Sequence, residues 1–240
     1  MQTLSVMDEV QALRAELQAA MPMIEHPVVQ ARVKGEFTLD QIRAIELQHY
    51  YEAKYFSSFV LNAIKKCEDD RDAWKWMVEN YADEASGDED HATLILILLD
   101  ALGVPREQAY AVEPTPGLVA WHQILEGVTT HGTFVEAMAA FYLEDTYPPV
   151  ARAINKAYRE IYGLDPQAIR TYRVHDEHDP IHGGRAQQIV ERHLTRQPEL
   201  LPKFKRAIKA CWNAYVFSFD GYYQAATGRR EFWPGVRPLL

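Results

Sequence analysis

The segment from His175 to His182 (HDEHDPIH) carries the densest group of possible metal ligands in the chain. His175, Asp179 and His182 stand at positions i, i+4 and i+7, so on a helix their side chains lie on one face over two turns. Imidazole nitrogen and carboxylate oxygen together suit iron, manganese or zinc. His178 falls off this face and is expected at the surface. A solvated, acidic and histidine-rich turn is the alternative interpretation.

Two further segments offer ligands of the same types. Glu84 and His91 are seven residues apart with Asp88 between them, and we expect them to present a carboxylate and an imidazole to one side. Glu144 follows an apolar run, so we expect it where the interior of a helical bundle begins; a snorkelling or capped glutamate is the alternative. The three segments together supply three imidazoles and three carboxylates, a set with which helical bundles hold paired irons.

The elements that position these residues are expected to be helices. Apolar residues recur three and four positions apart between only 12 Gly and 13 Pro, which is the period of an amphipathic helix, and strands are hard to find. The expected helices cover about 6–22, a short stretch after Pro27, 38–67, 70–85, 88–103, 115–132, 133–162, a helix from 165 that carries the histidine segment, and 198–227. This pattern predicts one all-helical domain over residues 1–240, a bundle of seven or eight helices.

Local signals mark several helix boundaries. Thr38 with Gln41 three positions on forms a capping box, and Gly228 is a stop signal. The Pro148-Pro149 pair is expected to kink the helix over 133–162. Pro180 and the glycines at 183 and 184 predict low helix stability beside the proposed ligands. The aromatic tail over 230–240 is expected to pack as an irregular strap.

Composition and charge exclude several classes of function. The chain has 240 residues, is 48% hydrophobic and 25% charged, and is therefore expected to be globular. Its 25 Lys and Arg against 34 Asp and Glu give a net charge of −9, which repels phosphate, so neither nucleic acid nor a membrane surface is an expected partner. No membrane span or leader pattern is visible, and a cytoplasmic location is expected. Cys67 and Cys211 are expected to be buried thiols.

The three ligand segments resemble motifs of the haem-oxygenase-like di-metal oxidases, in the superfamily that also contains thiaminase II and pyrroloquinoline quinone synthase. The resemblance covers about residues 20–220 and looks closest to the chlamydial branch, whose D-E-x5-N-H, Y-x-x-E and H-x3-D-x2-H elements match Asp83 to His91, Phe141 to Glu144, and His175 to His182. It implies a haem-oxygenase-like helical bundle with two ferrous ions and dioxygen as co-substrate. The implied metal ligands are Glu84, His91, Glu144, His175, Asp179 and His182. Among these, Glu84, Glu144 and His175 are the expected catalytic residues, and no organic cofactor is implied.

The chain departs from its relatives at the residues of three special chemistries. The chlamydial branch consumes one of its own tyrosines, but the corresponding stretch 25–29 has no tyrosine, and the lysine that this chemistry needs is replaced by Ile154. The thiaminase cysteine has no counterpart in 141–146. Haem would be bound through His26, but the surplus of carboxylates argues against a porphyrin. Self-sacrificing, thiaminase and haem chemistry are therefore not expected.

The resemblance implies a non-haem di-iron oxidase or oxygenase of specialised metabolism. Similar proteins oxidise amino acids or fatty acids by desaturation, C–C cleavage, decarboxylation or N-oxygenation, so we expect hydrogen abstraction from a small carboxylate substrate, an amino acid being the favoured class. Candidate substrate-binding residues are Tyr51, Glu52, Lys54, Arg152 and Arg185. The two arginines would hold a carboxylate in a bidentate fork, and Glu52 would bind an amine or act as a further metal ligand. Ordinary surface positions are the alternative for all five.

Two other functions are compatible with the sequence. One is a cofactor-independent oxidase resembling pyrroloquinoline quinone synthase, in which the histidines act as acid and base. The other is a non-catalytic helical module that binds a partner, which would display an exposed apolar patch. As partners we expect a small-molecule substrate, with an external electron donor and a homodimer as further candidates.

Overall fold

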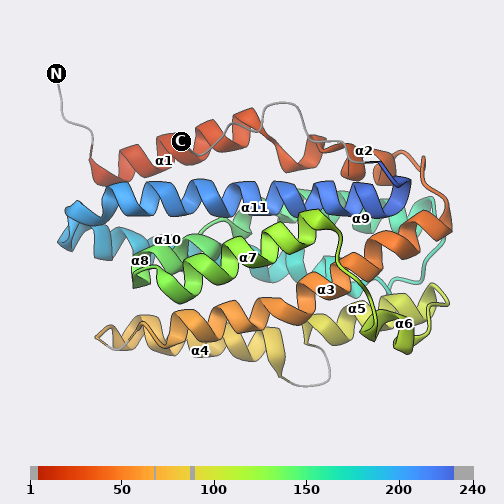
Figure 1. Ribbon diagram of the computed structural model, residues 1–240, viewed down its shortest axis with the longest axis horizontal. Coiled ribbons are helices and arrows are strands. Elements are labelled where there is room, and N and C mark those ends of the chain that lie inside the picture. Colours follow the sequence, from red (N-terminus) through yellow and green to blue (C-terminus); the bar gives the residue numbers. More distant parts are fainter. Residues whose placement is uncertain (1–4, 68, 87–89, 230–240) are drawn as a thin grey trace.

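The computed structural model describes residues 5–67, 69–86 and 90–229, and within these residues it is helical without strands. The long helices lie side by side along the longest axis of the molecule, with α11 at the centre of the view (Figure 1). This confirms the predicted all-helical fold class.

Eight of the described helices have eleven or more residues, in agreement with the expected seven or eight: α1 (Val6–Ala20), α3 (Leu39–Ile64), α4 (Arg71–Ala85), α5 (His91–Ala101), α7 (Pro116–His131), α9 (Pro148–Glu160), α10 (Arg170–Arg196) and α11 (Leu201–Thr227). The shorter ones are α2 (Pro27–Val33), α6 (Arg106–Tyr110) and α8 (Phe134–Ala137), with 3-10 turns η1 (Met23–Glu25), η2 (Met138–Ala140), η3 (Glu144–Thr146) and η4 (Pro198–Leu200).

Helix boundaries that depend on local capping agree with the prediction. The Thr38 hydroxyl accepts from the Gln41 backbone N–H at 3.3 Å, and the Gln41 side chain accepts from the Thr38 N–H at 2.9 Å, so both halves of the capping box start α3. Gly228 ends α11 with a φ of 70°, a left-handed conformation that glycine adopts without a Cβ clash. These ends are predictable because a cap involves only neighbouring residues.

The predicted kinked helix over 133–162 is wrong. α8 ends at Ala137, two 3-10 turns follow, and α9 begins at Pro148. Proline in the first turn of a helix loses no hydrogen bond, because those N–H groups have no partner within the helix. The proline pair therefore starts a helix and does not bend one, and Glu144 lies in the short turn η3 between two helices.

Two other predicted helix starts lie too early. The side chain of Asp165 accepts from the Gln167 N–H at 2.7 Å in a turn, and α10 begins at Arg170 and runs unbroken through Pro180 to Arg196. α5 begins at His91, where Asp90 caps it by accepting from the Thr93 N–H at 2.7 Å. Asp88 and the tail over 230–240 lie outside the described residues.

The core forms where α11 packs against α7 and α3, while α10 packs against α9 and η3. Cys67 and Cys211 are buried free thiols, as predicted. No described helix has the length and apolar character required to cross a membrane.

Candidate metal centre

A cavity of about 100 Å³ lies among α3, α4, α5, η3, α10 and α11. This volume has room for several water molecules or a small ligand. Five of the six predicted metal ligands line it: Glu84, His91, Glu144, His175 and Asp179. The sixth, His182, is buried behind them with its Nδ1 3.5 Å from Glu144 Oε2. The structure therefore brings together the side chains of all three ligand segments.

Glu84 and His91 meet across a connection between two helices. Glu84 ends α4 and His91 begins α5, so the single shared face expected from their spacing is wrong, although the side chains do meet. His91 Nδ1 lies 2.7 Å from Glu84 Oε2, and both residues are buried. Burial by itself lowers the pKa of His91, but the charge and hydrogen bond of Glu84, together with the charges of Asp179 and Asp83, outweigh burial and raise that pKa to about 9. This corner is therefore a buried ion pair.

The ligands on α10 share one face, as their spacing predicts. His175 Nδ1 lies 3.1 Å from Asp179 Oδ1, and the His175 ring centre is 4.6 Å from that of His91. One turn further along, His182 Nε2 lies 3.2 Å from Asp83 Oδ2. Burial holds the pKa of His175 well below, and that of Asp179 well above, its ordinary value. In this environment the neutral forms of both side chains are favoured.

The environment of the Glu144 carboxyl indicates that the site suits a cation. Both of its carboxyl oxygens are buried, and neither has a hydrogen-bond partner among the described residues. Burial, and then the nearby Asp179 and Glu84, raise the pKa of Glu144 well above its usual range. A buried carboxyl without partners is costly, and a metal ion beside several imidazoles would satisfy it. The donor set therefore fits iron.

These side chains pair with one another and do not surround a common point. Within the described part of the chain, no group of three or more His, Cys, Asp or Glu side chains has an arrangement that could already hold one ion. Small rotations of side chains that already line one cavity would be needed to bring them to metal-bond distances of ~2 Å.

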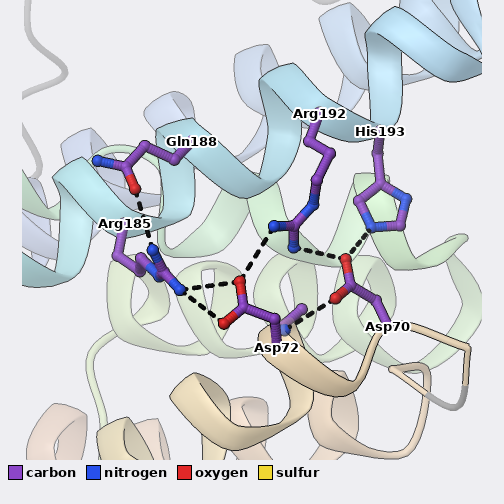
Figure 2. Close-up of polar contacts among 7 residues, drawn as sticks. Asp70, Asp72, Arg185, Gln188, Arg192 and His193 are labelled. Carbon is purple, nitrogen blue, oxygen red and sulfur yellow. Dashed lines mark hydrogen bonds and ion pairs between the residues drawn. The ribbon is translucent and has the colours of Figure 1, made fainter.

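An ion-pair network on the surface fixes α4 against α10, the two helices that carry four of the proposed ligands (Figure 2). Asp70 and Asp72 lie at the start of α4 and face two arginines and a histidine on α10. Arg192 bridges both aspartates at 2.6 and 3.0 Å, and His193 Nε2 lies 2.9 Å from Asp70. Arg185 forms two bonds to Asp72, at 2.8 and 2.9 Å.

The expected arginine clamp for a substrate carboxylate is not found at the cavity. Arg185 is engaged with Asp72 in this network, and Arg152 pairs with Asp176 at 2.9 Å on the surface, where its side chain is 62% exposed. Neither arginine is among the described lining residues. The helical phase of α9 and α10 turns both outward, which the sequence did not indicate.

Of the three candidates on α3, Glu52 alone lines the cavity. Lys54 is exposed and lies over the ring of Tyr55. Tyr51 packs against Tyr55 and His122. Burial raises the pKa of Glu52 to about 8, against smaller lowering effects from a hydroxyl and an arginine.

His49 lines the cavity one helical turn before Glu52 and was not among the predicted site residues. Its Nδ1 lies 3.0 Å from Glu46 Oε2, and Glu46 is fully buried. The other oxygen of Glu46 accepts hydrogen bonds from the hydroxyls of Tyr158 and, at 2.7 Å, Tyr172. Although burial raises the pKa of Glu46, the hydrogen bond and charge of His49, together with Arg32 and Tyr158, outweigh burial and lower it. The spacing of His49 and Glu52 at i and i+3 was the available signal.

The residues that haem binding or thiaminase chemistry would use are not at the cavity. His26 uses both ring nitrogens, since Nδ1 accepts from the Val28 N–H at 3.2 Å and Nε2 lies 3.0 Å from Asp220. Neither cysteine is among the described lining residues of the cavity.

Comparison with known proteins gives the family of the chain. Residues 44–216 match the family described as iron-containing redox enzymes. The chain is 30% identical over 171 residues to 4-aminobenzoate synthase of Chlamydia muridarum, which covers 70% of this chain and 72% of that protein. It is 22% identical over 221 residues to 4-chloro-allylglycine synthase of Streptantibioticus cattleyicolor, covering 90% and 78% respectively.

Solved structures show the same fold. A TenA homologue from Pseudomonas syringae superposes with a TM-score of 0.75 at 16% identity, over 93% of this chain and 98% of that one. A domain with a heme oxygenase-like fold from Shewanella denitrificans also gives a TM-score of 0.75, at 14% identity over 93% and 94%. The predicted haem-oxygenase-like bundle is confirmed.

Proposed function

The chain belongs to the iron-containing redox enzyme family, and on that basis we propose that it is a non-haem di-iron oxidase that uses dioxygen to oxidise a small amino-acid-like substrate. The two relatives described above are named for products that carry an amino and a carboxyl group, 4-aminobenzoate and 4-chloro-allylglycine. Family membership favours this function over the cofactor-independent oxidase and the non-catalytic partner-binding module. Hydrogen abstraction followed by desaturation, cleavage, decarboxylation or N-oxygenation is the proposed reaction type.

The observation that carries the proposal is the carboxyl of Glu144, whose two oxygens are buried without a hydrogen bond from the described residues, in a cavity that four other ligand-type side chains line. The residues that would hold two ions are Glu84, His91, Glu144, His175, Asp179 and His182. When bound, ferrous ions supply the electrons that activation of dioxygen requires. The chain's own contribution is to position the ligands and to exclude water with apolar walls such as Phe56 and Leu143. An external electron donor belongs to the proposal wherever turnover needs more electrons than the substrate provides.

Anaerobic titration with ferrous ion tests the metal site directly. We expect two ions per chain, and fewer in His91→Ala and His175→Ala, because each variant removes an imidazole from the cavity. His131→Ala is the matched control, since His131 is exposed at the end of α7 and should leave the stoichiometry unchanged. Iron loss in the control equal to that in the site variants, or no stoichiometric binding by the wild type, would contradict the proposal. Zinc is a poor substitute as a probe, because its raw affinity for such sites exceeds that of ferrous ion.

Oxygen uptake tests the reaction. The iron-loaded chain should consume dioxygen faster with the correct compound in a screen of free amino acids and fatty acids, and an optical spectrum after oxygen exposure should change in step. Background uptake with every compound would remove the substrate class from the proposal while leaving the metal site to its own test.

A further inference from the structure

We infer that the cavity binds its substrate through a protonated amine, which pairs with the carboxylate of Glu52. The inference deepens the proposed function and rests on it for the identity of the site. Glu52 recognises the cation, and the apolar wall of the cavity recognises a hydrocarbon chain.

The charges around the cavity favour a cation. Among the described lining residues, Glu52 is the carboxyl that lies outside the proposed ligand set, and neither Lys nor Arg is present. Three basic residues that the sequence suggested for substrate binding are not among the described lining residues: Lys54, Arg152 and Arg185. A carboxylate group on the substrate would therefore find no basic side chain among the described lining residues, whereas an ammonium group would find a carboxylate.

Glu52 itself lacks a counterion. No described Lys, Arg or His side chain forms an ion pair with it, and the charge that acts on it is the field of Arg32, a residue committed to Glu46 and Tyr172. Burial therefore dominates and raises the pKa of Glu52 to about 8. A cation that entered the cavity would favour the ionised form and form a buried pair.

His49 lines the cavity one helical turn away from Glu52. Glu46 is a carboxylate and can only accept, so the 3.0 Å contact between them places the proton of His49 on Nδ1. This contact fixes the orientation of the imidazole ring beside Glu52. Because Glu52 is at i+3 from His49, the two side chains are neighbours on the same face of α3, and both line the cavity.

The wall between this face and the metal ligands is apolar. Met23, Phe56 and Phe219 line it, and Tyr147 packs edge-on against the ring of His175 at 5.1 Å between centres. A cavity of about 100 Å³ suits a short chain and excludes a long one. The ligand class is therefore a small primary amine with a short hydrocarbon segment, such as the side chain or the α-amino end of an amino acid.

Binding of three matched probes tests the inference in the full-length chain, both as purified and after loading with ferrous ion under argon. The probes are n-butylammonium, butyrate and n-butanol, which are unbranched four-carbon compounds that differ in charge. Calorimetry should show n-butylammonium binding most tightly. Glu52→Gln should weaken it at least tenfold, as removal of a charged hydrogen-bond partner does, and Glu52→Asp should give an intermediate affinity. Lys54→Gln, two residues away and exposed, is the matched control and should bind like the wild type.

Each outcome decides between the possible roles of Glu52. Butyrate binding as tightly as n-butylammonium, or equal affinities of wild type, Glu52→Asp and Glu52→Gln for the amine, would overturn the inference. Glu52→Gln should also bind as many ferrous ions as the wild type. Loss of an ion would identify Glu52 as a metal ligand and overturn the inference without touching the di-iron proposal. If the wild type itself binds no iron, the proposed function fails, and the order of affinities for the three probes still reports on Glu52.

Discussion

Replacement of Gly183 by alanine is expected to disturb the metal site, whereas the same replacement at Gly184 is not. A Cβ on Gly183 would lie 2.7 Å from the backbone nitrogen of Asp145 and 2.8 Å from its Cβ, while a Cβ on Gly184 would meet nothing within 4 Å. Asp145 cannot yield easily, because Arg14 and Gln187 hold its two carboxyl oxygens at 2.6 and 2.8 Å. The clash must therefore separate η3 from α10.

The magnitude follows from two opposing terms. Alanine in place of glycine within a helix stabilises it by about 1 kcal/mol, and this gain is common to both positions. Overpacking costs about 1–3 kcal/mol and applies at Gly183 alone. Gly184→Ala should thus be more stable than the wild type by up to about 1 kcal/mol, and Gly183→Ala less stable than Gly184→Ala by about 1–3 kcal/mol. For a chain of this size each kcal/mol corresponds to roughly 2–4 °C in Tm.

Thermal and urea unfolding of the two variants, followed by ferrous titration, give the measurement. Asp145 is adjacent to Glu144, and Gly183 is adjacent to His182, so a shift at their contact should weaken iron binding in Gly183→Ala and leave it intact in Gly184→Ala. If both variants changed in stability by the same amount and in the same direction, the steric argument would be refuted. If Gly183→Ala lost stability but bound iron normally, the contact would have no part in positioning the ligands.

Four further predictions address the surface network, the ligand helix, the external arginine and the buried network. The pKa of Asp70 is about 2, against an ordinary 3.8, because a helix-capping N–H and the adjacent histidine and arginine together outweigh burial. The ionised carboxylate of Asp70 therefore stabilises the folded chain fully above about pH 4, and this stabilisation is lost as the pH falls through about 2. Asp70→Asn, which keeps the cap, should therefore unfold more easily in urea at pH 7, by less than about 2.5 kcal/mol, and match the wild type near pH 2. Hydrogen exchange over 174–186 should slow when ferrous ion is added, because ligand repulsion and an internal proline weaken the helix there; equal protection in both states would refute the coupling. Arg152→Gln should change neither iron binding nor the free energy of unfolding by more than about 0.5 kcal/mol, since the ion pair of Arg152 is exposed. A loss of substrate affinity in this variant would instead support a role for Arg152 in binding a substrate carboxylate. Tyr158→Phe should cost about 1–3 kcal/mol in urea unfolding, because it removes a donor from the buried Glu46, and wild-type stability would show that the carboxylate is satisfied without it.

The sequence by itself determined the features that depend on neighbours along one helix. The capping box at Thr38 and the glycine stop at Gly228 are set by residues within one turn, so their positions could be predicted. The common face of His175, Asp179 and His182 follows from the period of the helix alone, because hydrogen bonds inside the helix fix the angle between successive side chains. The all-helical class follows from the same period repeated along the chain.

Tertiary structure alone decided how the segments meet. Glu144 reaches the cavity from a 3-10 turn that packs against α10, and Glu84 meets His91 across the ends of two helices. Arg152 and Arg185 were plausible substrate ligands until the packing of α9 and α10 turned them toward surface aspartates. Such placements depend on contacts between residues tens of positions apart, whose energies arise from packing and burial of whole helices and leave no periodic trace in the local sequence.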